Sequence, residues 1–210
     1  MTRSRRLLDA CAPALDRALE MRFVREVADG TVGDAAYADY LEIEAAFVET
    51  AARLHGLAAW DAPGWTAIGR NARAAYALVT GQADYFEAAR AAWPVPARLD
   101  RDAARGAGGL SRYALDAARE GGYPAVMTVL FAAETLYLTW CSRAHREGRV
   151  RPGPIADWVA LHADEAFRAG VDALAREVDG LPETVPDERL ERWFTGMLDA
   201  EIAFHDAVYA

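Results

Sequence analysis

The sequence has 210 residues, of which 53% are hydrophobic and 26% charged, and its formal net charge at pH 7 is −9. These values argue against a disordered chain, and the length predicts one domain over residues 1–210. The acidic balance disfavours nucleic acid as a partner, because a phosphate backbone would be repelled. Cys11 and Cys141 are the only cysteines, which argues against a disulfide framework or structural zinc site and fits a cytoplasmic protein.

No membrane segment is predicted. Residues 1–20 begin basic but then mix charges and Pro13 with apolar residues, unlike the continuous apolar core of a signal peptide. The apolar run over residues 123–141 is barely long enough to span a bilayer, and its central Glu134 would add about 2.5 to 3.5 kcal/mol to insertion. A buried helix explains this run better.

In chain order, apolar residues recur with a helical period, and no segment alternates with period two. Glycine and proline clusters predict breaks between roughly seven helical segments. These breaks fall at residues 28–34, 60–65, 93–100, 105–111, 147–155 and 179–188. The predicted fold is all-α, a single-domain multi-helix bundle.

The first candidate site residue is an acid within an apolar stripe. The stripe over residues 37–58 has helical spacing, and Glu44 occupies one of its positions, whereas Glu42 and Glu49 fall outside it. Glu44 is therefore expected to point into the bundle. Tyr40 and Phe47 share its stripe.

Two further acids show the same pattern. Glu134 has apolar neighbours three and four residues away, including Tyr137, and no basic residue of its segment is near enough to pair with it. Glu201 fills a gap in the apolar stripe over residues 190–208, and His205 follows it by four residues. We expect all three acids to face inward, with the pKa of Glu134 raised most by its apolar setting.

Burying a carboxylate without partners costs several kcal/mol. Glu44 and Glu201 could be ordinary core acids that pair with an arginine of another helix, and Glu134 could donate to a backbone carbonyl or a helix end when protonated. Three such acids on three segments are better explained by a shared polar pocket. His162 and His205 lie on apolar stripes and are either packing residues or part of this pocket, where aromatic rings such as Tyr137 could stack on a flat heterocycle.

Two stretches carry a family resemblance. The stretch "RFVREVADGTVGDAAYADYLEIEAAFVETAARLHG" and the terminal "EIAFHDAVY" resemble patterns of the TenA family, also called thiaminase II, which implies a heme-oxygenase-like fold and a role in thiamin salvage. By position, Glu44 matches the family's acid that holds the aminopyrimidine edge, and Glu201 its catalytic C-terminal glutamate. The resemblance also implies a homo-oligomer, either dimer or tetramer.

The sequence departs from the family pattern at several positions. In "LFAAE", Ala132 or Ala133 stands where many members have a nucleophilic cysteine, which resembles the cysteine-lacking branch, where a nearby glutamate such as Glu134 takes over. His162 stands where tyrosine is common, and His205 where tryptophan is common. These changes indicate an altered pocket.

The resulting hypothesis is a hydrolase that acts on a small-molecule pyrimidine, either an aminopyrimidine from thiamin breakdown or its N-acylated form, and needs no cofactor or metal. Glu201 and Glu134 are the expected catalytic residues. The expected substrate-binding residues are Glu44, Tyr40, Phe47, Tyr137, His162 and His205. Two alternatives stay open. One is a di-iron oxidase on the same scaffold, although paired Glu-x-x-His motifs are absent. The other is a non-catalytic pyrimidine-binding or regulatory protein.

Overall fold

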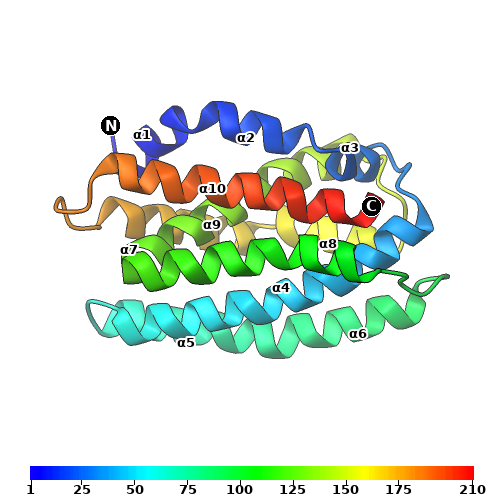
Figure 1. Ribbon diagram of the computed structural model, residues 1–210, viewed down its shortest axis with the longest axis horizontal. Coiled ribbons are helices and arrows are strands. Elements are labelled where there is room, and N and C mark those ends of the chain that lie inside the picture. The colour runs from blue at the N-terminus through cyan, green and yellow to red at the C-terminus, as the bar shows by residue number, and fades with distance from the viewer.

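The computed structural model describes residues 1–210 except the side chains of Arg101 and Asp102. Within this description the chain is helical and has no strand, which confirms the all-α prediction (Figure 1). The helices are α1 (Arg3–Ala10), α2 (Ala12–Leu19), α3 (Arg22–Ala28), α4 (Asp34–Asp61), α5 (Trp65–Ala77), α6 (Ala83–Ala92), α7 (Arg101–Glu147), α8 (Pro154–Ala163), α9 (Glu165–Asp179) and α10 (Asp187–Asp206). A π-helical turn, η1 (Leu78–Gln82), joins α5 to α6, and a 3₁₀ turn, η2 (Ala207–Tyr209), follows α10.

The long helix α7 forms the centre of the bundle. It packs against α10, α4, α8 and α9, which surround it. Its segment Ala103–Glu147 contains a stretch long and apolar enough to cross a membrane, with a mean hydropathy of 1.3, but 83% of that stretch is buried inside the protein. The composition of this segment is therefore that of a core helix.

Most predicted breaks coincide with connections between helices, but the one at residues 105–111 is wrong. Those residues lie inside α7, where the helix accommodates Gly106, Gly108 and Gly109. The irregularity in α7 lies instead at Gly122, whose φ of 58° requires glycine, two residues before Pro124. The sequence pattern missed this kink because the apolar period continues on both sides of it.

Close contact between α7 and α10 depends on small residues. A Cβ atom at Gly121 would collide with the ring of Trp193, and one at Gly196 would collide with the phenol of Tyr113. The Tyr113 hydroxyl donates to the backbone carbonyls of Arg192, at 3.1 Å, and Trp193, at 3.3 Å. These contacts fix α10, which carries Glu201, against the central helix.

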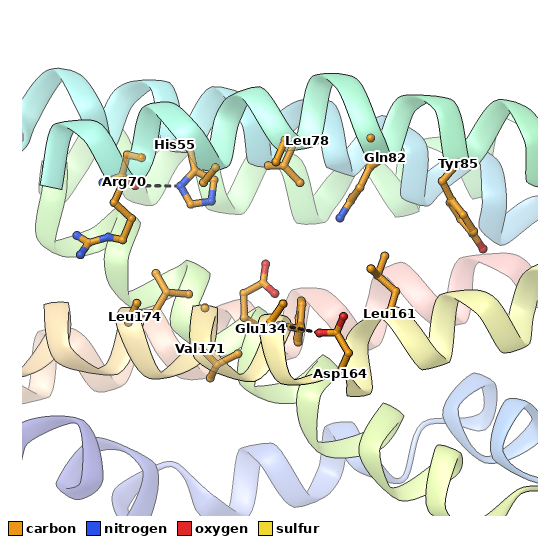
Figure 2. Close-up of a pocket in the computed structure, with 18 of the residues that line it drawn as sticks. His55, Arg70, Leu78, Gln82, Tyr85, Glu134, Leu161, Asp164, Val171 and Leu174 are labelled. Carbon is orange, nitrogen blue, oxygen red and sulfur yellow. Dashed lines mark hydrogen bonds between the residues drawn. The ribbon is translucent and has the colours of Figure 1, made fainter. Parts of the chain in front are cut away.

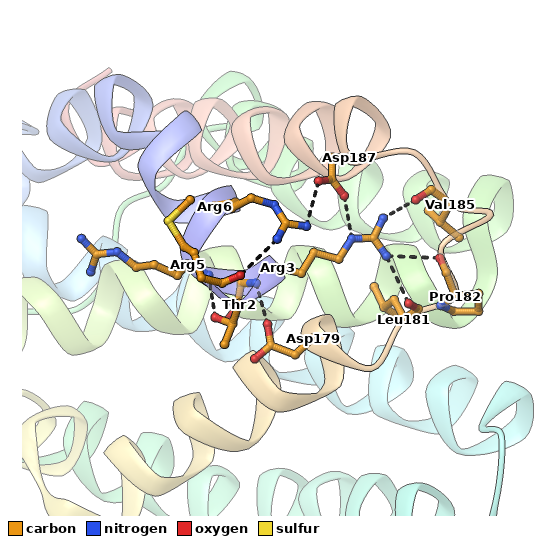
Figure 3. Close-up of polar contacts among 11 residues, drawn as sticks. Thr2, Arg3, Arg5, Arg6, Asp179, Leu181, Pro182, Val185 and Asp187 are labelled. Carbon is orange, nitrogen blue, oxygen red and sulfur yellow. Dashed lines mark hydrogen bonds and ion pairs between the residues drawn. The ribbon is translucent and has the colours of Figure 1, made fainter.

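The N-terminal helix α1 anchors the connection between α9 and α10 (Figure 3). Arg3 donates to the Asp187 carboxylate at 2.6 Å, and to the backbone carbonyls of Leu181 and Pro182, both at 3.2 Å, and of Val185. One largely buried guanidinium therefore satisfies three carbonyls that no helix pairs.

Helices α5 and α6 form an almost continuous outer rod that packs along α4 (Figure 1). The π-helical turn Leu78–Gln82 lies in the middle of this rod. Single π-helical turns inside α-helices occur frequently at functional sites. This turn lies beside the cavities described next.

Candidate functional site

Glu44, Glu134 and Glu201 come from α4, α7 and α10 and converge in the bundle. Glu44 and Glu201 are 4% and 0% exposed, whereas Glu42 and Glu49 face solvent, as their stripe positions predicted. In the part of the chain that the structure describes, none of the three inward acids forms an ion pair with an arginine. The explanation as ordinary arginine-paired core acids is therefore wrong.

Glu44 belongs to a hydrogen-bonded group with two tyrosines. The Tyr137 hydroxyl donates to Glu44 Oε2 at 2.8 Å and lies 3.1 Å from the Tyr40 hydroxyl. Burial raises the pKa of Glu44 to about 7, although bonds from Tyr137 and Tyr40 oppose the rise. The pKa values of both phenols are raised far above their usual range by burial, so both stay protonated and act as donors near neutral pH.

Glu134 differs from Glu44 because it has no hydrogen-bond donor among the described residues. Burial and the charge of Glu44 raise its pKa to about 7. Its side chain is partly exposed because it borders both cavities of the site. A carboxyl that is half-protonated at neutral pH and reachable from solvent is suited to general acid–base chemistry.

Glu201 lies deepest of the three. Both of its carboxyl oxygens are buried without a hydrogen-bond partner. Its pKa is raised far above the usual range, first by burial and then by the charges of Glu44 and Glu134. The prediction that Glu134 has the most strongly raised pKa was therefore wrong, because Glu134 reaches solvent while Glu201 does not. Burial therefore favours the neutral form of the Glu201 carboxyl group.

The two buried histidines have defined tautomers. His205 donates from Nδ1 to the backbone carbonyl of Glu201 at 2.8 Å, and His162 donates from Nδ1 to that of Trp158 at 2.9 Å. Burial lowers the pKa of each to about 4, so both rings are neutral at pH 7 and keep a lone pair on Nε2. The Nε2 of His205 lies 3.4 Å from the Tyr137 hydroxyl.

A small inner pocket of about 40 Å³ lies where α4, α7 and α8 meet η1. Of the residues predicted for the site, those that line it are Glu44, Phe47, Glu134, Tyr137 and His162. Tyr40, Glu201 and His205 do not line it and lie behind its wall, where they contact Tyr137 or Glu44 by hydrogen bonds or charge. The structure thus brings all eight residues into one cluster with two layers.

A larger cleft of about 700 Å³ lies outside the inner pocket, between the α5–η1–α6 rod and helices α8 and α9. Figure 2 shows Glu134 pointing into this outer cleft from one side and Gln82 from the other. Leu78, Gln82 and Glu134 border both cavities and therefore lie between them. Sequence reasoning missed Leu78 and Gln82, because no periodic signal marks the π-helical turn that directs both side chains to the same side.

The oxidase alternative requires a group of metal ligands. Among the described residues, no three His, Cys, Asp or Glu side chains are grouped closely enough to hold a metal ion. The three inward acids are not part of the paired Glu-x-x-His motifs that a di-iron site in a helical bundle uses. The geometry therefore gives this alternative no ligand set.

Solved structures share the whole fold. A TenA homologue from P. horikoshii OT3 is 15% identical with a TM-score of 0.85, and the match covers 100% of this chain and 99% of that chain. A TenA homologue from Pyrococcus furiosus is 21% identical with a TM-score of 0.84, and the match covers 99% of this chain and 100% of that chain. A protein described as a TenA family transcription regulator, from Silicibacter sp. TM1040, is 17% identical with a TM-score of 0.83. This match covers 97% of this chain and 95% of that chain. At these identities the likeness establishes the fold alone.

No protein with a curated description matches the chain. A family model, described as the TENA/THI-4/PQQC family, matches residues 10–210, which is nearly the whole sequence. The chain therefore belongs to the TENA/THI-4/PQQC family.

Proposed function

We propose that this protein hydrolyses an aminopyrimidine related to thiamin breakdown, or its N-acylated form. Water replaces the nitrogen substituent on the methylene arm of the ring and gives hydroxymethylpyrimidine. The observation that carries this proposal is the convergence of three carboxyl groups with no cationic partner, one of which reaches a solvent-accessible cleft.

The inner pocket suits the edge of an aminopyrimidine, which presents an N–H donor beside a ring nitrogen acceptor. Glu44 with a pKa of about 7 accepts from the amino group and shares a proton with the ring nitrogen. The neutral His162 supplies a further acceptor at Nε2. Tyr137 and Phe47 offer aromatic walls for the ring.

The carboxyl groups would divide the proton transfers between them. Glu134 contacts the outer cleft, from which water arrives, and serves as the general base that activates it. The raised pKa of Glu201 favours its protonated form, and we assign it as the acid for the leaving nitrogen once the bound ligand opens the wall that separates Glu201 from the pocket. Its two unpartnered oxygens support this role, because buried polar groups normally have partners and a ligand atom would supply one.

A covalent thioether route is not supported. By the family resemblance, Ala132 or Ala133 stands at the position of the nucleophilic cysteine. Burial raises the pKa of Cys11 and of Cys141, so neither thiol is an activated nucleophile. We therefore favour the aminopyrimidine or its N-acylated form over thiamin itself.

A pyrimidine ring is larger than the inner pocket, whose volume is close to that of about one water molecule. The ligand would enter through the outer cleft and displace Leu78 and Gln82. Both residues belong to the π-helical turn, whose hydrogen bonding is less regular than that of the flanking α-helices.

Incubation of the protein with 4-amino-5-aminomethyl-2-methylpyrimidine tests the proposal, with the hydroxymethyl product followed by mass spectrometry. Glu201→Gln and Glu134→Gln should each lower kcat by roughly 100-fold or more. Glu49→Gln is the matched control, since Glu49 lies on α4 and faces solvent. Product formation that is equal in all four proteins would overturn the assignment of the acids.

The regulatory alternative gives a different result in the same experiment. A structurally similar protein is described as a transcription regulator, and a binding role for this chain predicts a tight complex without turnover. Calorimetric binding of the aminopyrimidine with no product would therefore replace the hydrolase by a pyrimidine-binding protein.

A further inference from the structure

The outer cleft is too large for the small group that would leave from a simple aminopyrimidine. Its volume of about 700 Å³ falls within the range of sites for drug-sized ligands. It is adjacent to the inner pocket, because Leu78, Gln82 and Glu134 border both cavities. A ligand that displaces Leu78 and Gln82 to occupy the inner pocket would therefore extend into this cleft.

The lining of the outer cleft is mainly apolar. The apolar side chains are Ala74, Ala77, Leu78, Leu161, Ala166, Phe167, Val171, Ala173 and Leu174. At the far end, the His55 ring donates from Nδ1 to Asn71 Oδ1 at 2.9 Å, and Arg70 pairs with Glu177 at 2.5 Å. Because these polar groups already have partners, the far end of the cleft offers its unsatisfied surface to apolar atoms. The acids of the lining are Glu134, Asp157 and Asp164.

An unpartnered amide marks the junction of the two cavities. Gln82 Oε1 is buried without a hydrogen-bond partner, and Figure 2 shows the Gln82 side chain directed into the cleft. The oxygen and nitrogen of a glutamine amide are interchangeable by rotation, so Gln82 can accept from an N–H group or donate to a carbonyl. A secondary amide in the ligand would satisfy it in either orientation.

We propose that the substrate is an amide with two parts, a heteroaromatic head for the inner pocket and an extended apolar acyl chain for the outer cleft, with Gln82 bound to the amide that joins them. This inference rests on the proposed function and names its substrate class. The reaction is unchanged: the bond between the methylene carbon and nitrogen breaks, water supplies the new C–O bond and a proton for the nitrogen, and a primary carboxamide leaves.

The cleft sets the length of the acyl chain. Arg70 and Gln82 both line the cleft from the same rod and are twelve residues apart, which is roughly 18 Å of helix. An extended chain advances about 1.2 Å per bond, as the reach of a polypeptide shows. Chains of roughly eight to twelve carbons therefore fit within the cleft.

The test compares the acetyl and decanoyl amides of 4-amino-5-aminomethyl-2-methylpyrimidine. Substrate consumption gives kcat/KM, and calorimetry on the Glu201→Gln protein gives Kd without turnover. Each fully buried methylene should tighten binding by about fourfold, so the decanoyl amide should bind at least about 30-fold more tightly than the acetyl amide even with partial burial.

A matched pair of variants on α9 locates the acyl site. Ala166 lines the cleft and Ala169 does not, and both are exposed, so Ala166→Glu and Ala169→Glu add the same charge without disturbing the core. Ala166→Glu should remove most of the preference for the decanoyl amide, because it places a carboxylate beside the acyl chain. Ala169→Glu should keep the preference.

The outcomes separate the two proposals. Hydrolysis of both amides at the same kcat/KM with equal Kd would overturn the acyl-chain proposal and leave the proposed function intact. Tight decanoyl binding that depends on Ala166 but gives no turnover would support the acyl site and overturn the hydrolase. If neither amide binds or reacts, the acyl-chain proposal is overturned, whereas the proposed function is decided by the assay with the free amine.

Discussion

Replacing Glu134 by glutamine should stabilise the protein at alkaline pH, although it removes a proposed catalytic group. Burial and the charge of Glu44 raise the pKa of Glu134 to about 7 in the folded protein, from an ordinary value of 4.5. Between these values the folded protein holds more protons than the unfolded chain, so its stability falls as the pH rises through this window. Above pH 7 the charged carboxylate lowers the free energy of unfolding by a constant amount.

The size of this cost follows from the two pKa values. At about 1.4 kcal/mol for each pKa unit, ionisation of Glu134 costs about 3 kcal/mol above its folded pKa. The side chain is partly exposed to the outer cleft, where solvent screens its charge, so we expect about 2 kcal/mol. Glutamine has nearly the same shape and no charge, and Glu134→Gln should therefore gain this amount near pH 8 and almost nothing near pH 4.

Urea unfolding followed by circular dichroism at about pH 4, 6 and 8 measures the difference. The titrations of His162 and His205 are common to both proteins and cancel in the comparison. Glu49→Gln, on the solvent-exposed side of α4, should stay within about 0.5 kcal/mol of the wild type. A Glu134→Gln protein that gains no stability as the pH rises would refute the argument that this carboxylate is buried without compensation.

Three further changes test other parts of the structure. Tyr137→Phe removes the donor to Glu44, so the ionisation that Glu44 contributes to the pH–rate profile should move to higher pH. Arg3→Ala should cost about 1 to 3 kcal/mol in urea unfolding, because it removes the side-chain donor to the carbonyls of Leu181 and Val185. Arg5→Ala, in an exposed pair, should cost about 0.5 kcal/mol or less. Gly121→Ala should cost about 1 to 3 kcal/mol in the same assay, because its methyl group collides with the α10 tryptophan ring; an unchanged midpoint would contradict this packing.

The sequence by itself determined the class of fold and the direction of the key side chains. Helical periodicity identifies which face of a segment is buried, so the inward positions of Glu44 and Glu201 followed from the spacing of their apolar neighbours. The glycine and proline clusters located most connections between helices, because these residues interrupt helices by their local backbone preferences. The pattern failed at residues 105–111, where tertiary packing keeps glycines helical, and at Gly122, where the kink leaves the apolar period unbroken.

Only the tertiary structure decided how the inward acids differ. Periodicity says that a side chain faces the core, but not what it meets there. Tyr137 donates to Glu44, Glu134 reaches the outer cleft, and Glu201 meets no donor, and these contacts join helices far apart in the chain. The outer cleft and Gln82 were likewise invisible in the sequence, because a cavity is defined by the separation of packed helices, which depends on long-range contacts rather than on local pattern.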